Sequence, residues 1–423
     1  MRGKTIRRTE IWIPRFQGDR SEFYGDTPVW EGTAELFIEG DLEEFDATGG
    51  TITCIVSLPR TEIALSDTSY QPETDGTINL ERGERQSINW HTPLGQAKLI
   101  DNYVYHNESV GADQALVRIQ RCQIVIEGHR TGTTSLGGIA LELEDILEAP
   151  LELLCLLSEK RIGWYEAQLT FLAGGDASPK FRNATVRRKV FLGRDAEKRR
   201  DRHEHELLIK KQFLQEGLFH KLVDNYARSP ARNLISGIIP PLLVSRSGGY
   251  IETEVALGYS VLENLVSSLG EDIENRSREE LKALDELASK LATVVASEIA
   301  DQKKVKGITD GITAELKRRP ISDRLFQLVK KYDLGVTKLM WPHGLGMTDE
   351  ELNSELKGIY KRRNGYVHKG KIWEYPPYVR DLWRMQRLAE LCILKLLDCP
   401  VDAINTDALT LISKSPIKHR AKN

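Results

Sequence analysis

One short segment of the chain combines residue types that can cleave RNA without a metal ion. It runs from Arg363 to His368 and reads RNGYVH. A neutral imidazole can remove the proton of a ribose 2′-hydroxyl, and an imidazolium can protonate the leaving 5′-oxygen. A guanidinium can bind the scissile phosphate and offset the negative charge that develops on its oxygens. We therefore take Arg363 and His368 as candidate catalytic residues, with Asn364 as the residue that orients them.

The helix that precedes this segment gives Arg363 its context. Apolar residues at helical spacing predict a helix over 349–364, and its apolar stripe ends at Tyr360. Arg363 follows three residues later, so it continues the buried stripe at a position where an apolar residue is usual. The Asn-Gly pair that comes next predicts the end of the helix, because both residue types are common where a helix stops. On this interpretation the chain turns there and brings His368 back towards Arg363.

Spacing alone is a weak signal in this chain. Arg200 and His205 lie the same distance apart within a run of charged residues, and Arg85 and His91 have a similar spacing among predicted strands. With nine histidines, about one or two such coincidences are expected. Only the segment that begins at Arg363 lies between two long predicted helices. Four basic residues around it are candidate contacts to RNA phosphates: Lys361, Arg362, Lys369 and Lys371.

The sequence offers little support for a metal or a cofactor. Nucleotide-binding loops of the type GxxxxGK[ST] or GxGxxG, the zinc motif HExxH and the nucleophile motif GxSxG are all missing. The five cysteines are scattered without a CxxC pair. His203 and His205 are two residues apart, so on a helix they point in different directions, and a third ligand is not evident. We expect neither a metal site nor a cofactor.

The elements that must position the candidate residues differ between the two halves of the chain. The first half alternates apolar and polar residues with the period of β-strands, as in Ile52, Cys54 and Val56. Five strands are predicted there, over 34–38, 51–58, 115–126, 165–171 and 184–192. Leucines over 141–160 instead predict one or two helices inserted between strands. We predict a β-rich, sandwich-like domain with a helical insertion.

The second half has the period of α-helices. Helices are predicted over 204–226, 251–269, 277–301, 322–333, 349–364 and 378–398. Two of them begin with a capping box, formed by Ser277 with Glu280 and by Thr348 with Glu351. A dense run of charges from Arg194 to His205 marks the change of period. The fold class is thus α+β in several domains: 1–200 β-rich, 201–245 a helical connector, 246–400 a helical bundle and 401–423 a tail.

Composition sets the class of protein. The chain has 423 residues, of which 40% are hydrophobic and 29% charged, as in ordinary globular proteins of two or three domains. The basic N-terminal stretch has no apolar run behind it, and apolar runs elsewhere are too short to span a membrane. We expect a cytoplasmic protein. Residues 1–200 hold 24 basic against 31 acidic residues, and residues 201–423 hold 35 against 31, so the second half better suits a polyanion.

The motif and its setting resemble a known family. An arginine and a histidine of this spacing, with a polar residue between them and between the last two long helices of a bundle, are similar to the HEPN ribonuclease superfamily. The stretch Tyr250 to Leu269 resembles the first helix of that bundle, with Glu263 in a characteristic place. A β-rich domain followed by an HEPN domain resembles ApeA-like anti-phage defence proteins. The resemblance covers about residues 200–400, and the first half only by its architecture.

The resemblance implies a function. It implies a metal-independent endoribonuclease toxin whose active site forms where two HEPN domains pair in a homodimer, each giving an arginine and a histidine. These roles carry over to Arg363 and His368, and the polar position to Asn364. RNA, with tRNA as the first candidate, is the implied substrate. The implied role is abortive infection, with a phage product as the trigger that the N-terminal domain senses.

Three other interpretations stay open. Arg363 alone is typical of a cation near a helix end, where it interacts with the last carbonyl groups. The helical domain is alternatively a non-catalytic dimerisation or adaptor module beside a β-rich ligand- or protein-binding domain. A third hypothesis makes the first half the active part, through the carboxylates Glu39, Asp41, Glu43, Glu44 and Asp46. No motif positions these carboxylates as a pair, so a solvated loop is the simpler interpretation.

Overall fold

The structure, a computed structural model, describes most of the chain. The described residues are 2–4, 10–12, 16–24, 27–34, 36–58, 68–72, 78–82, 87–110, 113–159, 161–173, 181–188, 207–246, 251–269, 277–317, 320–369 and 378–409. They divide into two compact units. One unit comprises Met1–Pro230 with Ala403–Asn405, and the other comprises Ala231–Asp402 with Thr406–Asn423. The division separates a strand-rich half from a helical half, so the α+β class is confirmed.

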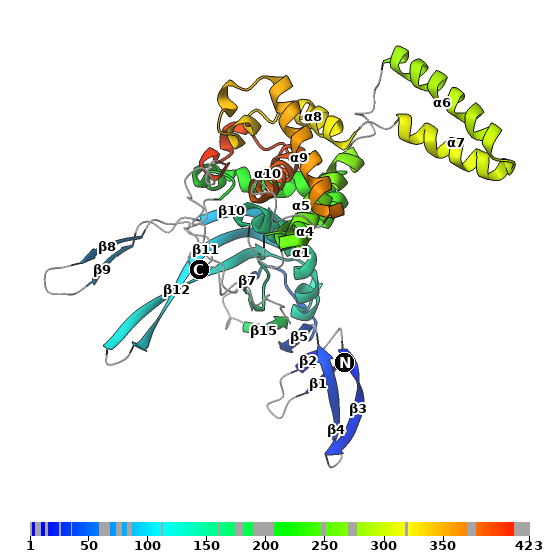
Figure 1. Cartoon of the computed structure of the whole chain (residues 1–423). Coiled ribbons are helices and arrows are strands. Elements are labelled where there is room, and N and C mark those ends of the chain that lie inside the picture. The colour runs from blue at the N-terminus through cyan, green and yellow to red at the C-terminus, as the bar shows by residue number, and fades with distance from the viewer. Residues whose placement is uncertain are drawn as a thin grey trace. The chain divides into compact units, whose positions relative to one another are not determined.

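The first unit is built on one nine-stranded antiparallel sheet (Figure 1). Its strands lie in the order β1-β2-β5-β15-β14-β7-β12-β11-β10. Their bounds are β1 Arg2–Lys4, β2 Glu10–Trp12, β5 Leu36–Gly40, β7 Thr51–Ser57, β10 Ser87–Thr92, β11 Gly95–Val110, β12 Asp113–His129, β14 Glu166–Leu172 and β15 Phe181–Arg188. The five predicted strands correspond to β5, β7, β12, β14 and β15.

Three small two-stranded sheets accompany the large one. They pair β3 (Phe16–Tyr24) with β4 (Thr27–Ala34), β8 (Thr68–Pro72) with β9 (Ile78–Arg82), and β6 (Phe45–Asp46) with β13 (Thr133–Thr134). The predicted sandwich is therefore wrong in its layout, since the described strands make one extended sheet and not two large facing ones. The alternation of apolar residues identifies a sheet with one buried face, but it does not reveal whether a second sheet or a helix covers that face.

A helix supplies much of the buried partner surface. Strand β7 buries every second residue, and α1 (Leu136–Ser158) buries almost every residue of its second half. Helix α1 begins at Ser135, whose hydroxyl accepts a hydrogen bond from the Gly138 amide at 3.1 Å, and it continues through Pro150. It contacts β15 and helix α3 (Phe219–Arg228) of the same unit. The predicted helical insertion over 141–160 is thus confirmed as a single, longer helix.

The first unit extends past the predicted boundary. The charge run from Arg194 to His205 lies outside the described residues. The next helical stretch comprises α2 (Lys211–Phe213), a π-helical turn over Leu214–Leu218 and α3. Within it Gly217 has φ of +99°, a conformation that glycine adopts at little steric cost. Because α3 packs on β10 and α1, this segment belongs with the sheet and not with the bundle.

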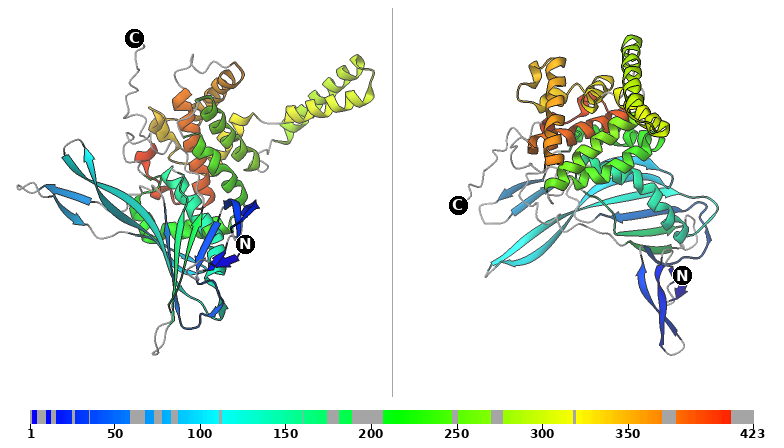
Figure 2. Two further views of the ribbon diagram at one scale, coloured as in Figure 1. Left: turned by 90° about the horizontal axis from the view of Figure 1, so that it is seen from below. Right: turned by 45° about the vertical axis from the view of Figure 1, so that its right-hand side comes forward.

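The second unit consists of helices. Their bounds are α4 Arg232–Val244, α5 Ile251–Leu269, α6 Arg278–Glu298, α7 Gln302–Lys317, α8 Ile321–Lys331, α9 Asp349–Lys369 and α10 Tyr378–Leu396, with 3-10 turns at Thr337–Met340 and Gly344–Gly346. Helix α5 contacts α4, α8, α9 and α10, so it is the central element of this bundle. Figure 2 shows the helices of this unit, α6 and α7 among them, in two further views.

Most of the predicted helices are present within a few residues of their predicted bounds. Both capping boxes are formed: Ser277 and Glu280 exchange hydrogen bonds of 3.2 and 3.1 Å, and Thr348 and Glu351 exchange bonds of 2.7 and 3.3 Å. Helix α7 was not predicted. Helix α4 lies within the predicted helical connector over 201–245, although no separate helix was predicted for its residues, and its two consecutive prolines are accommodated inside it.

Candidate active site on helices α5 and α9

Helices α5 and α9 pack side by side in a fixed register. The rings of Tyr259 in α5 and Tyr360 in α9 meet edge to face, with centroids 5.9 Å apart. The Tyr259 hydroxyl donates a hydrogen bond of 3.3 Å to the carbonyl of Ile359. One turn further along both helices, Glu263 meets Arg363. Both contacts lie within one turn of each helix, so Arg363 is placed by α5 as well as by its own helix.

The pair of Glu263 and Arg363 is the centre of the candidate site. Arg363 Nη2 lies 2.9 Å from Glu263 Oε1 and donates a hydrogen bond of 3.2 Å to Oε2. The shorter contact is an ion pair without hydrogen-bond alignment. Each side chain is 23% exposed, so the pair is shielded yet reachable from solvent. On its outer side Arg363 Nη1 donates a long hydrogen bond of 3.4 Å to Oδ1 of the exposed Asn364.

Three buried polar atoms of this cluster lack hydrogen-bond partners among the described residues. They are Arg363 Nε, Glu263 Oε1 and the hydroxyl oxygen of Tyr360. Burial raises the pKa of Tyr360, and the negative charge of Glu263 raises it further, while Arg363 and Arg324 act in the opposite direction. The phenol therefore stays protonated at neutral pH. Such unpartnered groups are rare in folded proteins and tend to lie where a ligand or a rearrangement completes their bonding.

Arg362 has a different environment from its neighbour. Its Nε and Nη2 donate hydrogen bonds of 2.6 and 2.9 Å to the two carboxylate oxygens of Asp381 in α10. Asp381 is fully buried, and a second cation, Arg384, lies 3.9 Å from it. This geometry gives Arg362 a structural role inside the bundle. Its predicted contact with RNA phosphate gains no support, because its guanidinium already binds a carboxylate in a two-pronged manner.

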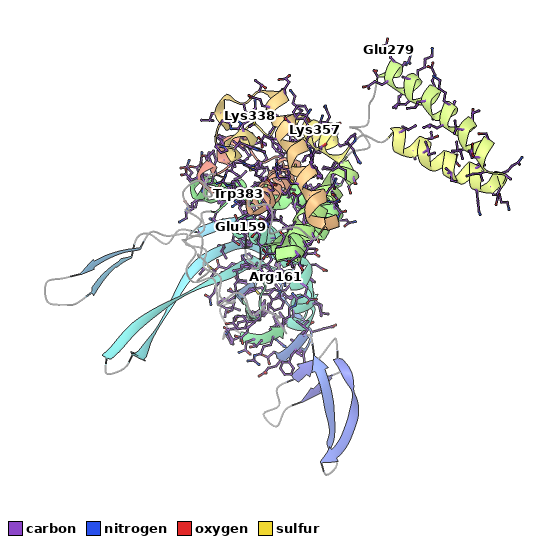
Figure 3. All side chains as sticks on the ribbon, in the orientation of Figure 1. Glu159, Arg161, Glu279, Lys338, Lys357 and Trp383 are labelled. Carbon is purple, nitrogen blue, oxygen red and sulfur yellow. The ribbon has the colours of Figure 1, made fainter. Side chains whose placement is uncertain are left out.

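Of the three remaining basic candidates, the structure describes the side chain of Lys361 but not those of Lys369 and Lys371. Lys361 is exposed on α9 and forms no ion pair with the described residues, so its ammonium group is available to a phosphate. One turn earlier, Lys357 pairs with Asp323 of α8 at 2.9 Å (Figure 3 labels this lysine). The Lys369 side chain and the whole of Lys371 lie outside the described residues, so their roles stay predictions.

The predicted turn before His368 is wrong. Helix α9 continues through Asn364 and Gly365 to Lys369. Asparagine and glycine are poor helix formers, at about 0.5–1 kcal/mol each relative to alanine, and that penalty does not stop a helix that other contacts hold. His368 thus lies on the same helix as Arg363, five residues later, at a position about 140° around the helix axis. The His368 side chain lies outside the described residues.

The five candidate carboxylates of the first unit are all described, and the contacts they make are separate and local. Glu39 pairs with Arg187 at 3.2 Å, and Asp41 accepts a hydrogen bond from the Asn183 amide. Asp46 accepts a hydrogen bond from the Thr48 amide at 3.0 Å, and the bonds from Thr48 lower the pKa of this carboxyl. Glu43 and Glu44 form no described ion pair. The solvated-loop interpretation fits these separate local contacts better than a paired-carboxylate site.

The part of the chain that the structure describes contains no group of three or more histidine, cysteine, aspartate or glutamate residues that could hold a metal ion. His203 and His205 lie outside that part. None of the described helices is both long and apolar enough to cross a membrane. These observations leave the cluster of Arg363, Glu263 and Tyr360 as the best-supported candidate site.

Comparisons with protein-family models, with curated proteins and with solved structures each find no match to this chain. The resemblance to HEPN ribonucleases therefore rests on the motif and its helical setting. The resemblance singled out Glu263, and in the structure this residue is partly buried and pairs with Arg363. Sequence reasoning missed Tyr360 and Asp381 as members of the polar network. For Asp381 the available signal in the sequence was the unusual density of charged residues along an otherwise apolar α10.

Proposed function

We propose that this protein is a metal-independent endoribonuclease of the HEPN type that cleaves RNA, with tRNA as the first candidate substrate. The observation that carries the proposal is the environment of Arg363: a guanidinium oriented by Glu263, partly shielded from water, and flanked by the exposed Lys361 and Asn364. A shielded, pre-oriented guanidinium binds a phosphodiester more effectively than a freely rotating one, because less side-chain entropy is lost.

In the proposed reaction the protein supplies both charge stabilisation and proton transfer. Arg363 binds the scissile phosphate, and Asn364 helps to fix its orientation. His368 takes the proton of the 2′-hydroxyl or gives a proton to the leaving 5′-oxygen. The 2′-oxygen attacks phosphorus and the P–O5′ bond breaks, which yields a 2′,3′-cyclic phosphate and a 5′-hydroxyl. No step of this scheme requires a metal ion.

The course of α9 favours a site shared between two copies. Arg363 and His368 occupy positions about 140° apart around the axis of one helix, so a single copy does not readily direct both at one phosphate. Two bundles that pair can bring the arginine of one copy towards the histidine of the other. We accordingly propose a homodimer through the helical domain. The β-rich unit then serves as a sensor of a phage-derived trigger, and the biological role is abortive infection.

A cleavage assay tests the proposal. Purified protein is incubated with total RNA and with tRNA in EDTA, beside Arg363→Ala and His368→Ala. Matched controls are Arg380→Ala and His343→Ala, which remove an exposed arginine and an exposed histidine of the same unit. We expect cleavage that survives EDTA and both controls and is lost in the two site variants. Unchanged cleavage in Arg363→Ala and His368→Ala would overturn the proposal.

The second candidate is an adaptor without catalytic activity. Its supporting observation is that Glu263 and Arg363 already satisfy much of each other's charge, as a structural ion pair between two helices does. Expression in cells separates the two functions. A toxin slows growth in a manner that depends on Arg363 and His368, whereas an adaptor leaves growth unchanged.

A further inference from the structure

Helices α6 and α7 form an antiparallel pair (Figure 2), and a side-chain cap marks the start of each helix. The capping box at Ser277 starts α6, and Glu279 stands in its first turn (Figure 3). Asp301 starts α7, where its Oδ1 accepts hydrogen bonds from the amides of Lys303 at 3.0 Å and Lys304 at 3.4 Å. The two helices contact each other far more than any other helix or strand. We call residues 277–317 the hairpin.

The seam inside the hairpin follows a coiled-coil pattern. Apolar and small residues recur at alternating spacings of four and three, which is the heptad period. They are Leu284, Ala288, Leu291 and Val295 in α6, and Val305, Thr309, Ile312 and Leu316 in α7. Of the hairpin residues whose side chains are described, only Ala288 is buried, at 6% exposure. Two helices alone therefore leave most of this seam half open.

A second apolar stripe lies beside the seam. Leu287, Val294 and Ile308 are 43%, 58% and 41% exposed. Leu287 and Val294 are seven residues apart, so they share one side of α6. Each of these two residues directly precedes a seam residue, as Ile308 does in α7. In an antiparallel pair of helices such positions lie on the same side, so Ile308 lies beside Leu287 and Val294, at a level between the two. The other side of α6 carries polar residues instead, among them Asp285 and Ser289.

Charge is distributed unevenly along the hairpin. The first half of α6 carries four carboxylates against two cations: Glu279, Glu280, Asp285 and Glu286 against Arg278 and Lys282. The first half of α7, at the opposite end of the hairpin, carries only cations: Lys303, Lys304 and Lys306. A second hairpin placed antiparallel to the first brings the basic part of each α7 towards the acidic part of the other α6. This pattern is self-complementary, as a two-fold interface requires.

We propose that the hairpin is a dimerisation arm whose occupant is the hairpin of a second copy of this chain. The two pair antiparallel into a four-helix bundle that covers Leu287, Val294 and Ile308 on both copies. Four helices enclose a core that two helices cannot, which explains why the hairpin has a heptad seam but hardly any buried residue. The proposal supplies an interface for the homodimer of the proposed function, but its test does not depend on RNA cleavage.

The first test measures the mass of the full-length protein by sedimentation over a range of concentrations. The variant Leu287→Glu/Val294→Glu places two charges on the apolar side. Its matched control, Ser289→Glu/Ala296→Glu, has the same spacing on the other side of α6 and also alters exposed residues. We expect the first variant to weaken self-association by roughly tenfold or more and the control to leave it unchanged. Equal association in all three proteins, or a wild type that stays monomeric, would overturn the proposal.

The second test examines the antiparallel arrangement. One variant carries Lys303→Glu/Lys306→Glu and the other carries Asp285→Lys/Glu286→Lys. Each alone places like charges opposite each other at both ends of the dimer, so both should self-associate more weakly than the wild type. A one-to-one mixture restores opposite charges at both ends and should form a heterodimer, most strongly at low salt. A mixture that behaves as the sum of its parts contradicts the antiparallel pairing.

These outcomes separate the arm from the nuclease. If RNA cleavage fails while the hairpin variants lose association as expected, the arm stands and the enzymatic proposal falls. If cleavage follows Arg363 and His368 but the hairpin variants still dimerise normally, the dimer forms elsewhere and the arm is refuted.

Discussion

Arg362 and Asp381 bind each other through two hydrogen bonds, of 2.6 and 2.9 Å, that join α9 to α10. The neighbouring Arg363 turns instead to Glu263 of α5. Successive residues on a helix point about 100° apart, so two adjacent arginines reach two different partner helices. One arginine thereby fixes the position of α9, and the other is presented at the surface of the candidate site.

Removing the carboxylate of Asp381 should destabilise the bundle strongly. In Asp381→Ala the guanidinium of Arg362 loses both acceptors, and Arg384 loses a nearby counter-charge in a buried setting. Breaking a buried pair typically lowers the free energy of unfolding by about 3–5 kcal/mol, and we expect about 3 kcal/mol because Arg362 is 29% exposed. Urea unfolding followed by circular dichroism measures this. The control Asp323→Ala, which removes the exposed ion pair with Lys357, should change the free energy by no more than about 1 kcal/mol.

Glu263 should act through Arg363. In Glu263→Gln one charge is lost while the size of the side chain is kept, so Arg363 is held less firmly. We expect the rate of RNA cleavage to fall by roughly tenfold, which is less than in Arg363→Ala. If Glu263 orients Arg363 in the transition state, the change in kcat should be larger than the change in KM. The double variant Glu263→Gln/Arg363→Ala should be no slower than Arg363→Ala alone. Additive losses in this cycle would show that Glu263 acts independently of Arg363.

The Tyr360 hydroxyl should contribute nothing favourable to the stability of the free protein. It is buried without a hydrogen-bond partner, so Tyr360→Phe removes an unsatisfied group and should leave the free energy of unfolding unchanged or raise it by about 1 kcal/mol. Tyr259→Phe is the matched control on the facing helix. It deletes a hydroxyl that donates to the Ile359 carbonyl and should lower the free energy by about 1 kcal/mol. A clear loss of stability in Tyr360→Phe would mean that this hydroxyl has a partner in solution.

Acid should weaken one contact at the start of α9. Asp349 pairs with Lys330 of α8 and lies 3.7 Å from Lys338, and the hydrogen bond from Lys330 lowers the pKa of this carboxyl below its ordinary value. A carboxyl whose pKa is lowered by folding contributes stability that is present above its unfolded pKa and is lost as pH falls through the folded value. Thermal unfolding between pH 5 and pH 2 should therefore show a slightly smaller acid loss in Asp349→Asn than in the wild type.

Local chemistry made much of the fold predictable. Strand β7 and helix α5 were placed within a residue or two, because the spacing of their apolar residues matches one period throughout. The capping boxes at Ser277 and Thr348 fixed the starts of α6 and α9, since each box is formed by residues only three apart. The segment from Arg363 to His368 was likewise visible as a set of residue types and as a continuation of a buried stripe.

Tertiary packing decided what neighbouring residues cannot encode. Helix α9 runs through Asn364 and Gly365, and α4 includes two prolines, because contacts with the rest of the bundle outweigh penalties of about 1 kcal/mol or less for Asn and Gly and about 3 kcal/mol for each proline. The apolar stripe marked Arg363 alone as inward-facing, yet the side chains of Arg362 and Arg363 are almost equally shielded, at 29% and 23% exposure. Their roles differ because Asp381 and Glu263, one on each neighbouring helix, lie opposite them in the folded chain. The sequence by itself determined which groups are available for chemistry, and only the packing of α5, α9 and α10 determined which of them is tied to a buried carboxylate and which is presented to a ligand.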